Sequence, residues 1–208
     1  FVAIANINKT PLALVANPDF EASTIAELIE LAKARPGEYF YATPGVGTTQ
    51  HLLIEMLEQD AGIDMQDTPY QGATPSLTAV ISGEIPLAII SLTAAVEQER
   101  GGKIKILGLT SPERIDDFPD IPTIGETVEG YGALPGNFLV APAGTPEAIV
   151  TELSDAVKQA LDDPELSGFL SNQGLLPTYM SAAELAETLP EEAAKWIATA
   201  KSLPKPNQ

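Results

Sequence analysis

Short apolar runs alternate with helical patterns along the first half of the sequence, and this alternation constrains the fold more than any other feature. The predicted strands are residues 12–16, 39–42, 65–70, 86–91 and 104–110. Segments with helical spacing or helix-start signals lie between them. Strands that alternate with helices are typical of a parallel sheet covered by helices. We therefore expect an α/β lobe in this half of the chain.

Signals for the ends of helices support this pattern. Thr24 and Glu27 form the three-residue spacing of a capping box, which predicts that a helix begins there. Thr74 is predicted to be an N-cap because Pro75 follows it at the first helical position. Gly83 is predicted to end that helix.

The second half of the chain has a different character. Residues 112–136 are rich in proline and glycine, and a crossing strand is predicted at residues 138–141. Helices are predicted to begin at Pro146, Pro164 and Ser181. A helical tail is thus expected after a crossing strand.

Composition excludes several classes of partner. Of 208 residues, 44% are hydrophobic, which is enough for a substantial core. The chain has 29 Asp and Glu against 11 Lys and Arg, a formal net charge of −18. Such a charge repels nucleic-acid phosphates and anionic membrane surfaces, so we expect no nucleic-acid partner. Without cysteine and with one histidine, a thiolate site and a multi-histidine metal site are both excluded, and we expect no metal and no cofactor.

The turn after the second predicted strand is the most informative segment. Gly45 and Gly47 let the backbone approach a ligand closely, with Val46 between them. The helix that follows directs its free N–H groups and positive dipole end toward the same place, which suits a carboxylate. Hydroxyl groups that can orient the ligand belong to Thr43, Thr48 and Thr49. The alternative is that this glycine-rich turn is merely structural.

Two later turns repeat the arrangement. The segment from Tyr70 to Thr74, with Gly72 inside it, follows the third predicted strand, and Ser91 ends the fourth. In open α/β sheets, ligands gather outside the carboxyl ends of the strands. We therefore predict that the three turns converge on one binding site.

A catalytic alternative rests on His51 and Glu55, which lie four residues apart on one predicted helix. They can form a base and the group that orients it, but no activated nucleophile accompanies them in the sequence. The competing interpretation is that His51 caps the helix, packs in the core or lines the binding site. An enzyme is therefore not expected.

Four motifs carry a resemblance to a known family. Residues 41–52 read Tyr-Ala-Thr-Pro-Gly-Val-Gly-Thr-Thr-Gln-His-Leu, and residues 69–73 read Pro-Tyr-Gln-Gly-Ala. Residues 109–114 read Leu-Thr-Ser-Pro-Glu-Arg, and residues 141–146 read Ala-Pro-Ala-Gly-Thr-Pro. Between these last two motifs, residues 118–123 read Phe-Pro-Asp-Ile-Pro-Thr. In this order and spacing they resemble the substrate-binding proteins of tripartite tricarboxylate transporters, also called Bug receptors.

The resemblance implies a type II periplasmic-binding-protein fold, with two α/β lobes joined by crossing strands. It implies a periplasmic receptor that binds a small di- or tricarboxylate and delivers it to the membrane permease subunits of the transporter. Backbone groups, hydroxyl side chains and ordered water hold the ligand in such receptors. The positions that carry over are Thr43, Gly45, Val46, Gly47, Thr48 and Thr49 in the first turn, and Tyr70 and Gly72 in the second.

The sequence departs from the family pattern in two ways. Nothing matches the N-terminal Gly-Gly turn of the family, and Phe1 begins the chain without a methionine or a charged leader, so we expect a processed or truncated chain with an incomplete first lobe. Ile90-Ser91 stands where many members have an Asp-Asn pair. The loss of an acidic group favours a plain carboxylate over an amino acid as ligand.

We expect residues 12–140 to form the second, ligand-binding lobe, and residues 1–11 with 141–208 to form the remainder of the first lobe. An incomplete lobe exposes apolar surface, which predicts self-association. The second functional hypothesis is a sensing module of the same fold that signals to a kinase or regulator. The third is a hydrolase or isomerase that uses His51 with Glu55.

Overall fold

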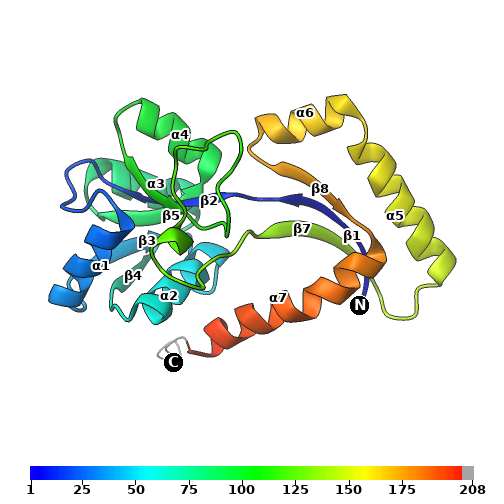
Figure 1. The fold of residues 1–208 in the computed structure, drawn as a ribbon, viewed down its shortest axis with the longest axis horizontal. Coiled ribbons are helices and arrows are strands. Elements are labelled where there is room, and N and C mark those ends of the chain that lie inside the picture. The colour runs from blue at the N-terminus through cyan, green and yellow to red at the C-terminus, as the bar shows by residue number, and fades with distance from the viewer. Residues whose placement is uncertain (203–208) are drawn as a thin grey trace. The chain divides into compact units, whose positions relative to one another are not determined.

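The computed structural model describes residues 1–202, and the chain divides into two compact units (Figure 1). The continuous unit is the uninterrupted segment Pro11–Leu134, and the discontinuous unit combines Phe1–Thr10 with Pro135–Lys201. The backbone passes from one unit to the other between residues 10 and 11 and between residues 134 and 135. At these crossings the Thr10 N–H donates a hydrogen bond to the Pro135 carbonyl at 2.6 Å.

The continuous unit contains a five-stranded sheet with the strand order β4-β3-β5-β2-β6. The strands are β2 (Leu12–Ala16), β3 (Phe40–Thr43), β4 (Gln66–Pro69), β5 (Leu87–Ser91) and β6 (Lys105–Leu109). β3 pairs in parallel with β4 and β5, whereas β2 pairs antiparallel with β5 and β6. The sheet is therefore mixed, and the expectation that it is parallel is wrong for β2. This strand follows directly from the discontinuous unit, so the alternation of strands and helices does not set its direction.

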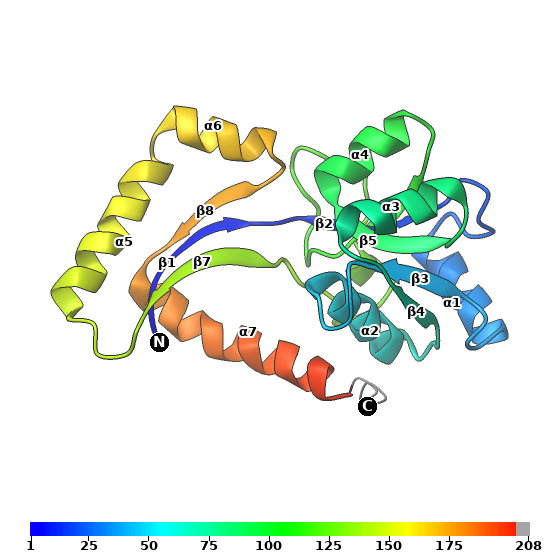
Figure 2. The same ribbon diagram turned by 180° about the vertical axis from the view of Figure 1, so that it is seen from behind.

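Helices cover this sheet on both faces. They are α1 (Ile25–Ala34), α2 (Thr49–Ala61), α3 (Ala73–Ser82) and α4 (Leu92–Arg100), and a short 3-10 helix spans Ile124–Glu126. Figures 1 and 2 show α3 and α4 on one side of the strands and α1 and α2 on the other. All five residues of β2 are buried between these layers, as expected for a central strand.

The helix boundaries test the capping predictions. The capping box is confirmed at α1, where Thr24 accepts the Glu27 N–H at 3.2 Å and Glu27 accepts the Thr24 N–H at 3.2 Å. Gly83 ends α3 in the left-handed conformation, as predicted. The prediction that Thr74 caps α3 is wrong, because α3 begins at Ala73 with Gly72 as its N-cap. Gly72 adopts a φ of 111°, which favours glycine.

The discontinuous unit contains a three-stranded antiparallel sheet with the order β7-β1-β8. Its strands are β1 (Val2–Lys9), β7 (Gly136–Ala141) and β8 (Leu176–Met180). Two buried asparagines of β1 bond to both neighbours. Asn6 Nδ2 donates to the Thr178 carbonyl at 2.6 Å, and Asn137 Nδ2 donates to Asn8 Oδ1 at 2.9 Å. The central strand is thereby joined to each edge strand by side chains as well as by backbone.

Three helices complete the discontinuous unit: α5 (Glu147–Leu161), α6 (Pro164–Asn172) and α7 (Ala182–Ser202). Each begins within one residue of its predicted start. The core contains Ile4, Ala5, Ala141 and Val150. Several large apolar side chains of α5 and α6 stay exposed, namely Ile149, Leu153, Leu166 and Phe169.

Across residues 1–202, no helix is both long enough and apolar enough to cross a membrane.

Candidate ligand-binding site

Three parallel strands of the continuous unit end at one edge of its sheet. β3 lies between β4 and β5 and runs parallel to both. Since parallel neighbours have their carboxyl ends on the same side, the three turns singled out from the sequence lie along this edge. Helices α2, α3 and α4 begin directly after these turns (Figure 2).

The first turn joins β3 to α2 and is held by internal hydrogen bonds. Gly45 and Gly47 have φ angles of 141° and 79°, a region that favours glycine. Thr48 is the N-cap of α2, and its hydroxyl donates to the Gly45 carbonyl at 2.8 Å. The same hydroxyl accepts the His51 N–H at 3.5 Å, and the Gly47 N–H donates to His51 Nδ1 at 3.0 Å. The turn is therefore fixed by Thr48 and His51 together.

The other predicted residues of this turn differ in burial. Val46 is 57% exposed, and Thr49 is also exposed. Thr43 is fully buried, and its hydroxyl donates to Asp67 Oδ1 on β4 at 2.7 Å. The Thr43 side chain thus joins two strands beneath the turn, while Val46 and Thr49 lie at the surface.

The second turn, between β4 and α3, is bonded directly to the first. The Tyr70 N–H donates to the Thr43 carbonyl at 2.8 Å, and the Gly72 N–H donates to the Pro44 carbonyl at 3.2 Å. The Tyr70 hydroxyl donates to Glu84 at 3.1 Å. The first two turns therefore form one bonded surface.

The third turn is the immediate step from β5 into α4. Ser91 is the last residue of β5 and the N-cap of α4, and its side chain makes no capping bond with the helix. Ser91 pairs with Leu12 of β2, and the Leu92 N–H donates to the Pro11 carbonyl at 3.0 Å. This turn therefore lies beside the point where the chain enters the unit.

The edge offers backbone donors and no formal charge. The first N–H groups of a helix have no acceptor within their own helix, and the helix dipole adds a partial positive charge there. Segments 43–49, 70–74 and 91–94 contain no acidic or basic residue. Three helix N-termini beside glycine and hydroxyl groups can bind an anion such as a carboxylate.

A polar cluster lies under the first turn and was only partly anticipated. His51 Nε2 lies 3.3 Å from Glu55 Oε1 and 3.8 Å from Asp67 Oδ2. The Tyr41 hydroxyl donates to Glu55 at 3.0 Å, and the Tyr41 ring stacks on His51 with centroids 6.3 Å apart. The spacing of His51 and Glu55 was visible in the sequence. The contribution of Asp67 was not, because only the parallel pairing of β3 and β4 brings it there.

The cluster shifts several pKa values. Burial is the largest single influence on His51 and lowers its pKa. The hydrogen bond with Glu55 and the charges of Asp67, Glu55 and Glu58 together outweigh burial, so the pKa of His51 is raised. The bond with His51 lowers the pKa of Glu55. Burial, with help from the charges of Glu55 and Asp64, raises the pKa of Glu58 to about 7, although the Met65 amide opposes it. The carboxylates thus favour a proton on His51, and burial favours one on Glu58.

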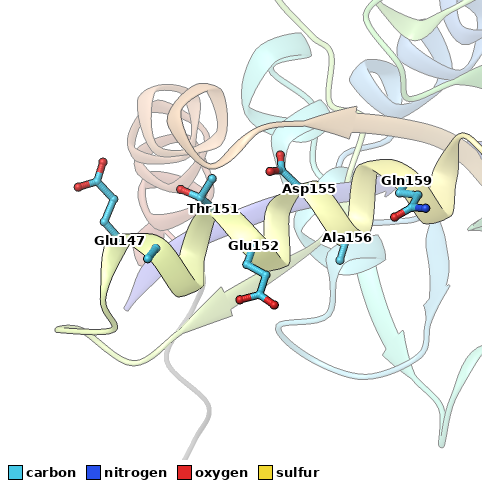
Figure 3. Close-up of a pocket in the computed structure, with 7 residues that line it drawn as sticks. Glu147, Thr151, Glu152, Asp155, Ala156 and Gln159 are labelled. Atoms are coloured by element: carbon cyan, nitrogen blue, oxygen red, sulfur yellow. The ribbon is translucent and has the colours of Figure 1, made fainter.

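A surface hollow lies on the discontinuous unit. Figure 3 shows it along α5, and every residue that lines it belongs to that helix. Three of the lining residues are the acidic Glu147, Glu152 and Asp155. Because their carboxylates repel an anion, we assign the candidate site to the turns and not to this hollow. Among the described residues, no group of three or more His, Asp or Glu is arranged to hold a metal ion.

Comparison with known proteins agrees with this architecture. A family model described as the tripartite tricarboxylate transporter family receptor matches residues 1–204. A UPF0065 protein of Bordetella pertussis is 35% identical over 190 residues, which are 91% of this chain and 59% of that protein. The chain therefore spans somewhat less than two thirds of the length of this relative.

Solved structures show the same fold. A protein of R. palustris with adipate has a TM-score of 0.82 and 30% identity, covering 97% of this chain and 68% of that one. MatC from Rhodopseudomonas palustris with bound malate has a TM-score of 0.80 and 26% identity, and the match covers 96% of this chain and 69% of MatC. The predicted α/β class and periplasmic-binding-protein type of fold are confirmed.

Proposed function

Because the chain belongs to the tripartite tricarboxylate transporter family of receptors, as its four motifs predicted, we propose that it binds a small di- or tricarboxylate at the three turns of the continuous unit. The ligand would be held by backbone N–H groups of the first turns of α2, α3 and α4. Hydroxyl groups of Thr49 and Ser91 would orient it, while the Thr48 hydroxyl stays bonded to the Gly45 carbonyl and holds the turn. The bound molecule would be released unchanged, since the proposed role is reception and not catalysis.

The observation that carries this proposal is that three helix N-termini follow the carboxyl ends of three parallel strands, β3, β4 and β5, at one edge of the mixed sheet. An anion is favoured there because unpaired amide donors and helix dipoles act together. A cation is disfavoured for the same reason. Adipate and malate accompany two structurally similar proteins, and both are dicarboxylates.

The absence of an acidic residue in the three turns narrows the ligand class. An amino acid carries an ammonium group that needs a carboxylate or carbonyl partner, and segments 43–49, 70–74 and 91–94 contain no carboxylate. Plain carboxylates are therefore the proposed ligands. Tight binding of aspartate without binding of succinate, its deaminated analogue, would contradict this part of the proposal.

A thermal-shift series with adipate, malate, citrate, succinate and aspartate tests the function. A ligand that binds only the folded state stabilises it by about 2.7 kcal/mol at a hundred times its Kd, so the melting temperature must rise with ligand concentration. We expect this rise for at least one of the first four acids. A flat response to all of them would reject carboxylate reception.

Thr49→Pro tests the site itself. Residue 49 is the first residue of α2, where proline is tolerated, and the preceding Thr48 has the extended backbone that proline requires, with φ −70° and ψ 161°. The substitution removes the amide donor and the hydroxyl of residue 49, and it keeps the helix. We expect the Kd of the best ligand to rise by roughly tenfold or more, the worth of one hydrogen bond to a charged group.

Glu147→Pro is the matched control. It places proline at the first residue of α5, after Pro146 with ψ 139°, and removes the equivalent donor far along the chain from the proposed site. We expect no change in Kd. An equal loss in both variants would show that the donor at residue 49 has no special role.

We further propose that the receptor acts in the periplasm and passes its ligand to the membrane permease subunits of a tripartite transporter. The family assignment supports this, because the family is described by that transporter. Uptake of the identified ligand by cells, compared with and without the receptor gene, is the direct measurement. Unchanged uptake would reject the delivery role.

A further inference from the structure

His51 has different partners on its two ring nitrogens. The Gly47 N–H donates to Nδ1 at 3.0 Å, so this nitrogen is an acceptor and carries no hydrogen. Nε2 faces Glu55 Oε1 at 3.3 Å and Asp67 Oδ2 at 3.8 Å, so the ring hydrogen lies on Nε2. The contacts therefore define a neutral imidazole, held between the first turn and two carboxylates.

The neutral ring is directly coupled to the shape of the turn. Gly47 has a φ of 79°, and its exposed backbone directly precedes the Thr48 N-cap of α2. A second ring proton must go to Nδ1, because Nε2 already carries one. The Nδ1–H would then point at the Gly47 N–H, and a hydrogen bond would become a contact between two donors. The turn cannot keep its present conformation with His51 protonated.

The surroundings of the ring favour protonation. His51 is 4% exposed, and the ionisable groups that face it are Glu55 and Glu58 on its own helix, Asp67 on β4, and the Tyr41 hydroxyl group on β3. No cation faces His51 among the groups that act on it. The hydrogen bond with Glu55 and the charges of Asp67, Glu55 and Glu58 raise the pKa of His51 above its ordinary value, against the effect of burial. The carboxylates attract a proton that the turn cannot accommodate.

We propose that His51 is a positioning residue that holds the first turn in its ligand-binding form, and that its protonation releases Gly47 and weakens carboxylate binding as the pH falls. This inference rests on the function proposed above. It adds that the receptor would load its ligand at neutral or alkaline pH and bind it less tightly in an acidified compartment.

The switch itself can be measured without ligand. In NMR spectra of the whole chain between pH 6 and 8.5, the Gly47 amide resonance should move with the same midpoint as the ring resonances of His51. Glu55→Gln removes one of the charges that favour the proton, so both midpoints should move together to lower pH. A Gly47 amide that stays constant while His51 titrates would overturn the proposal.

Ligand binding provides the second measurement, with adipate as the probe over the same pH range. Adipate is mostly the dianion over this range, and its own residual titration at the acidic end is the same for the wild type and for every variant. The wild type should lose roughly tenfold in affinity across the midpoint of His51, about the worth of one hydrogen bond. His51→Asn places an amide oxygen near the position of Nδ1 and does not titrate. It should therefore keep most of the affinity and show only the small pH dependence that comes from adipate itself.

His51→Leu and an unrelated carboxylate variant complete the design. His51→Leu removes the acceptor, so adipate should bind roughly tenfold more weakly at every pH. Glu30→Gln, at an exposed position of α1, should behave as the wild type. A wild-type pH profile in His51→Asn would overturn the proposal. If adipate does not bind at any pH, the proposed function loses support. The titration of the Gly47 amide tests the switch independently, because it needs no ligand.

Discussion

At the scale of single residues, the candidate site depends on glycines whose backbone angles are unfavourable for any other residue. An added Cβ at Gly47 would meet no atom within 4 Å, so the space around it is free. Its φ of 79° is nevertheless unfavourable for any residue with a side chain. Gly47→Ala should therefore lower the free energy of unfolding by about 1 kcal/mol through backbone strain alone. Urea denaturation measures this directly.

Gly168→Ala is the matched control for that variant. Gly168 also has free space around it, but it lies within α6 and has no left-handed φ. Alanine should stabilise this helix by about 0.5–1 kcal/mol. If Gly47→Ala lowers the free energy of unfolding and Gly168→Ala raises it, the cost at Gly47 comes from its backbone angle. A change of the same sign in both variants would contradict that explanation.

Glu58 gives a pH-dependent prediction. Its folded pKa of about 7 exceeds the ordinary value of 4.5, so its ionised form opposes folding. The cost is absent below pH 4.5, grows between pH 4.5 and 7, and is complete above pH 7. Glu58→Gln should therefore stabilise the protein by about 1 kcal/mol at pH 8, after allowance for solvent screening, and not at pH 4.5. Urea denaturation at both pH values measures this. An equal gain in the free energy of unfolding at pH 4.5 and pH 8 would show that the buried charge of Glu58 is not its cause.

At the scale of elements, the pairing of β1 with β7 leaves no room for a side chain at residue 136. A Cβ at Gly136 would lie 2.7 Å from the Asn8 carbonyl oxygen and 3.0 Å from Asn6 Oδ1. Gly136→Ala should force the two strands apart and cost about 1–3 kcal/mol, the usual range for overpacking. Hydrogen exchange of the β1 amides should accelerate in this variant. Unchanged exchange and stability would show that the strands can move apart freely.

The elements also show what the sequence could predict. Strands and helices of the continuous unit appear where local periodicity, caps and glycine stops indicated them, because these signals act over a few residues. β1 and β8 were not predicted. All five residues of β8 are half-buried and include Pro177, so the strand has neither alternation nor a continuous apolar run. Its pairing with β1 depends on contacts such as Asn6 to Thr178, which lie 172 residues apart.

The candidate site shows the same division. The sequence indicated the three turns and their common edge, since strand ends and helix starts are local features. It did not indicate that Thr43 is buried against Asp67 or that His51 accepts the Gly47 amide. The first depends on the neighbouring strand, and the second depends on the conformation of a glycine turn. Side-chain direction within a turn is fixed by such contacts and not by the pattern of residue types.

At the scale of the whole molecule, exposed apolar side chains act against a high net charge. Phe169 is 59% exposed and Ile149 is 46% exposed, both on the discontinuous unit, while the chain carries a formal charge of −18. Charge repulsion keeps copies apart at low ionic strength and is screened by salt. We expect light scattering to show a molar mass that rises with protein concentration, and more steeply at high salt.

Phe169→Glu should reduce this association, because it removes apolar surface and adds charge. Ala26→Glu, at an exposed position of α1, adds the same charge without removing a large apolar group. It should therefore have the smaller effect. Equal effects of the two variants would assign the association to net charge alone.

The division of the chain into a continuous and a discontinuous unit has a consequence for synthesis. Every residue of the segment Pro11–Leu134 is available once Leu134 has left the ribosome, so the continuous unit can fold while translation continues. β1 is made before the continuous unit but must wait for its partners, because those in β7 begin at Gly136 and those in β8 come later still. Contacts of such long sequence separation form slowly. A strand that is synthesised before the whole continuous unit is therefore paired only after that unit is complete.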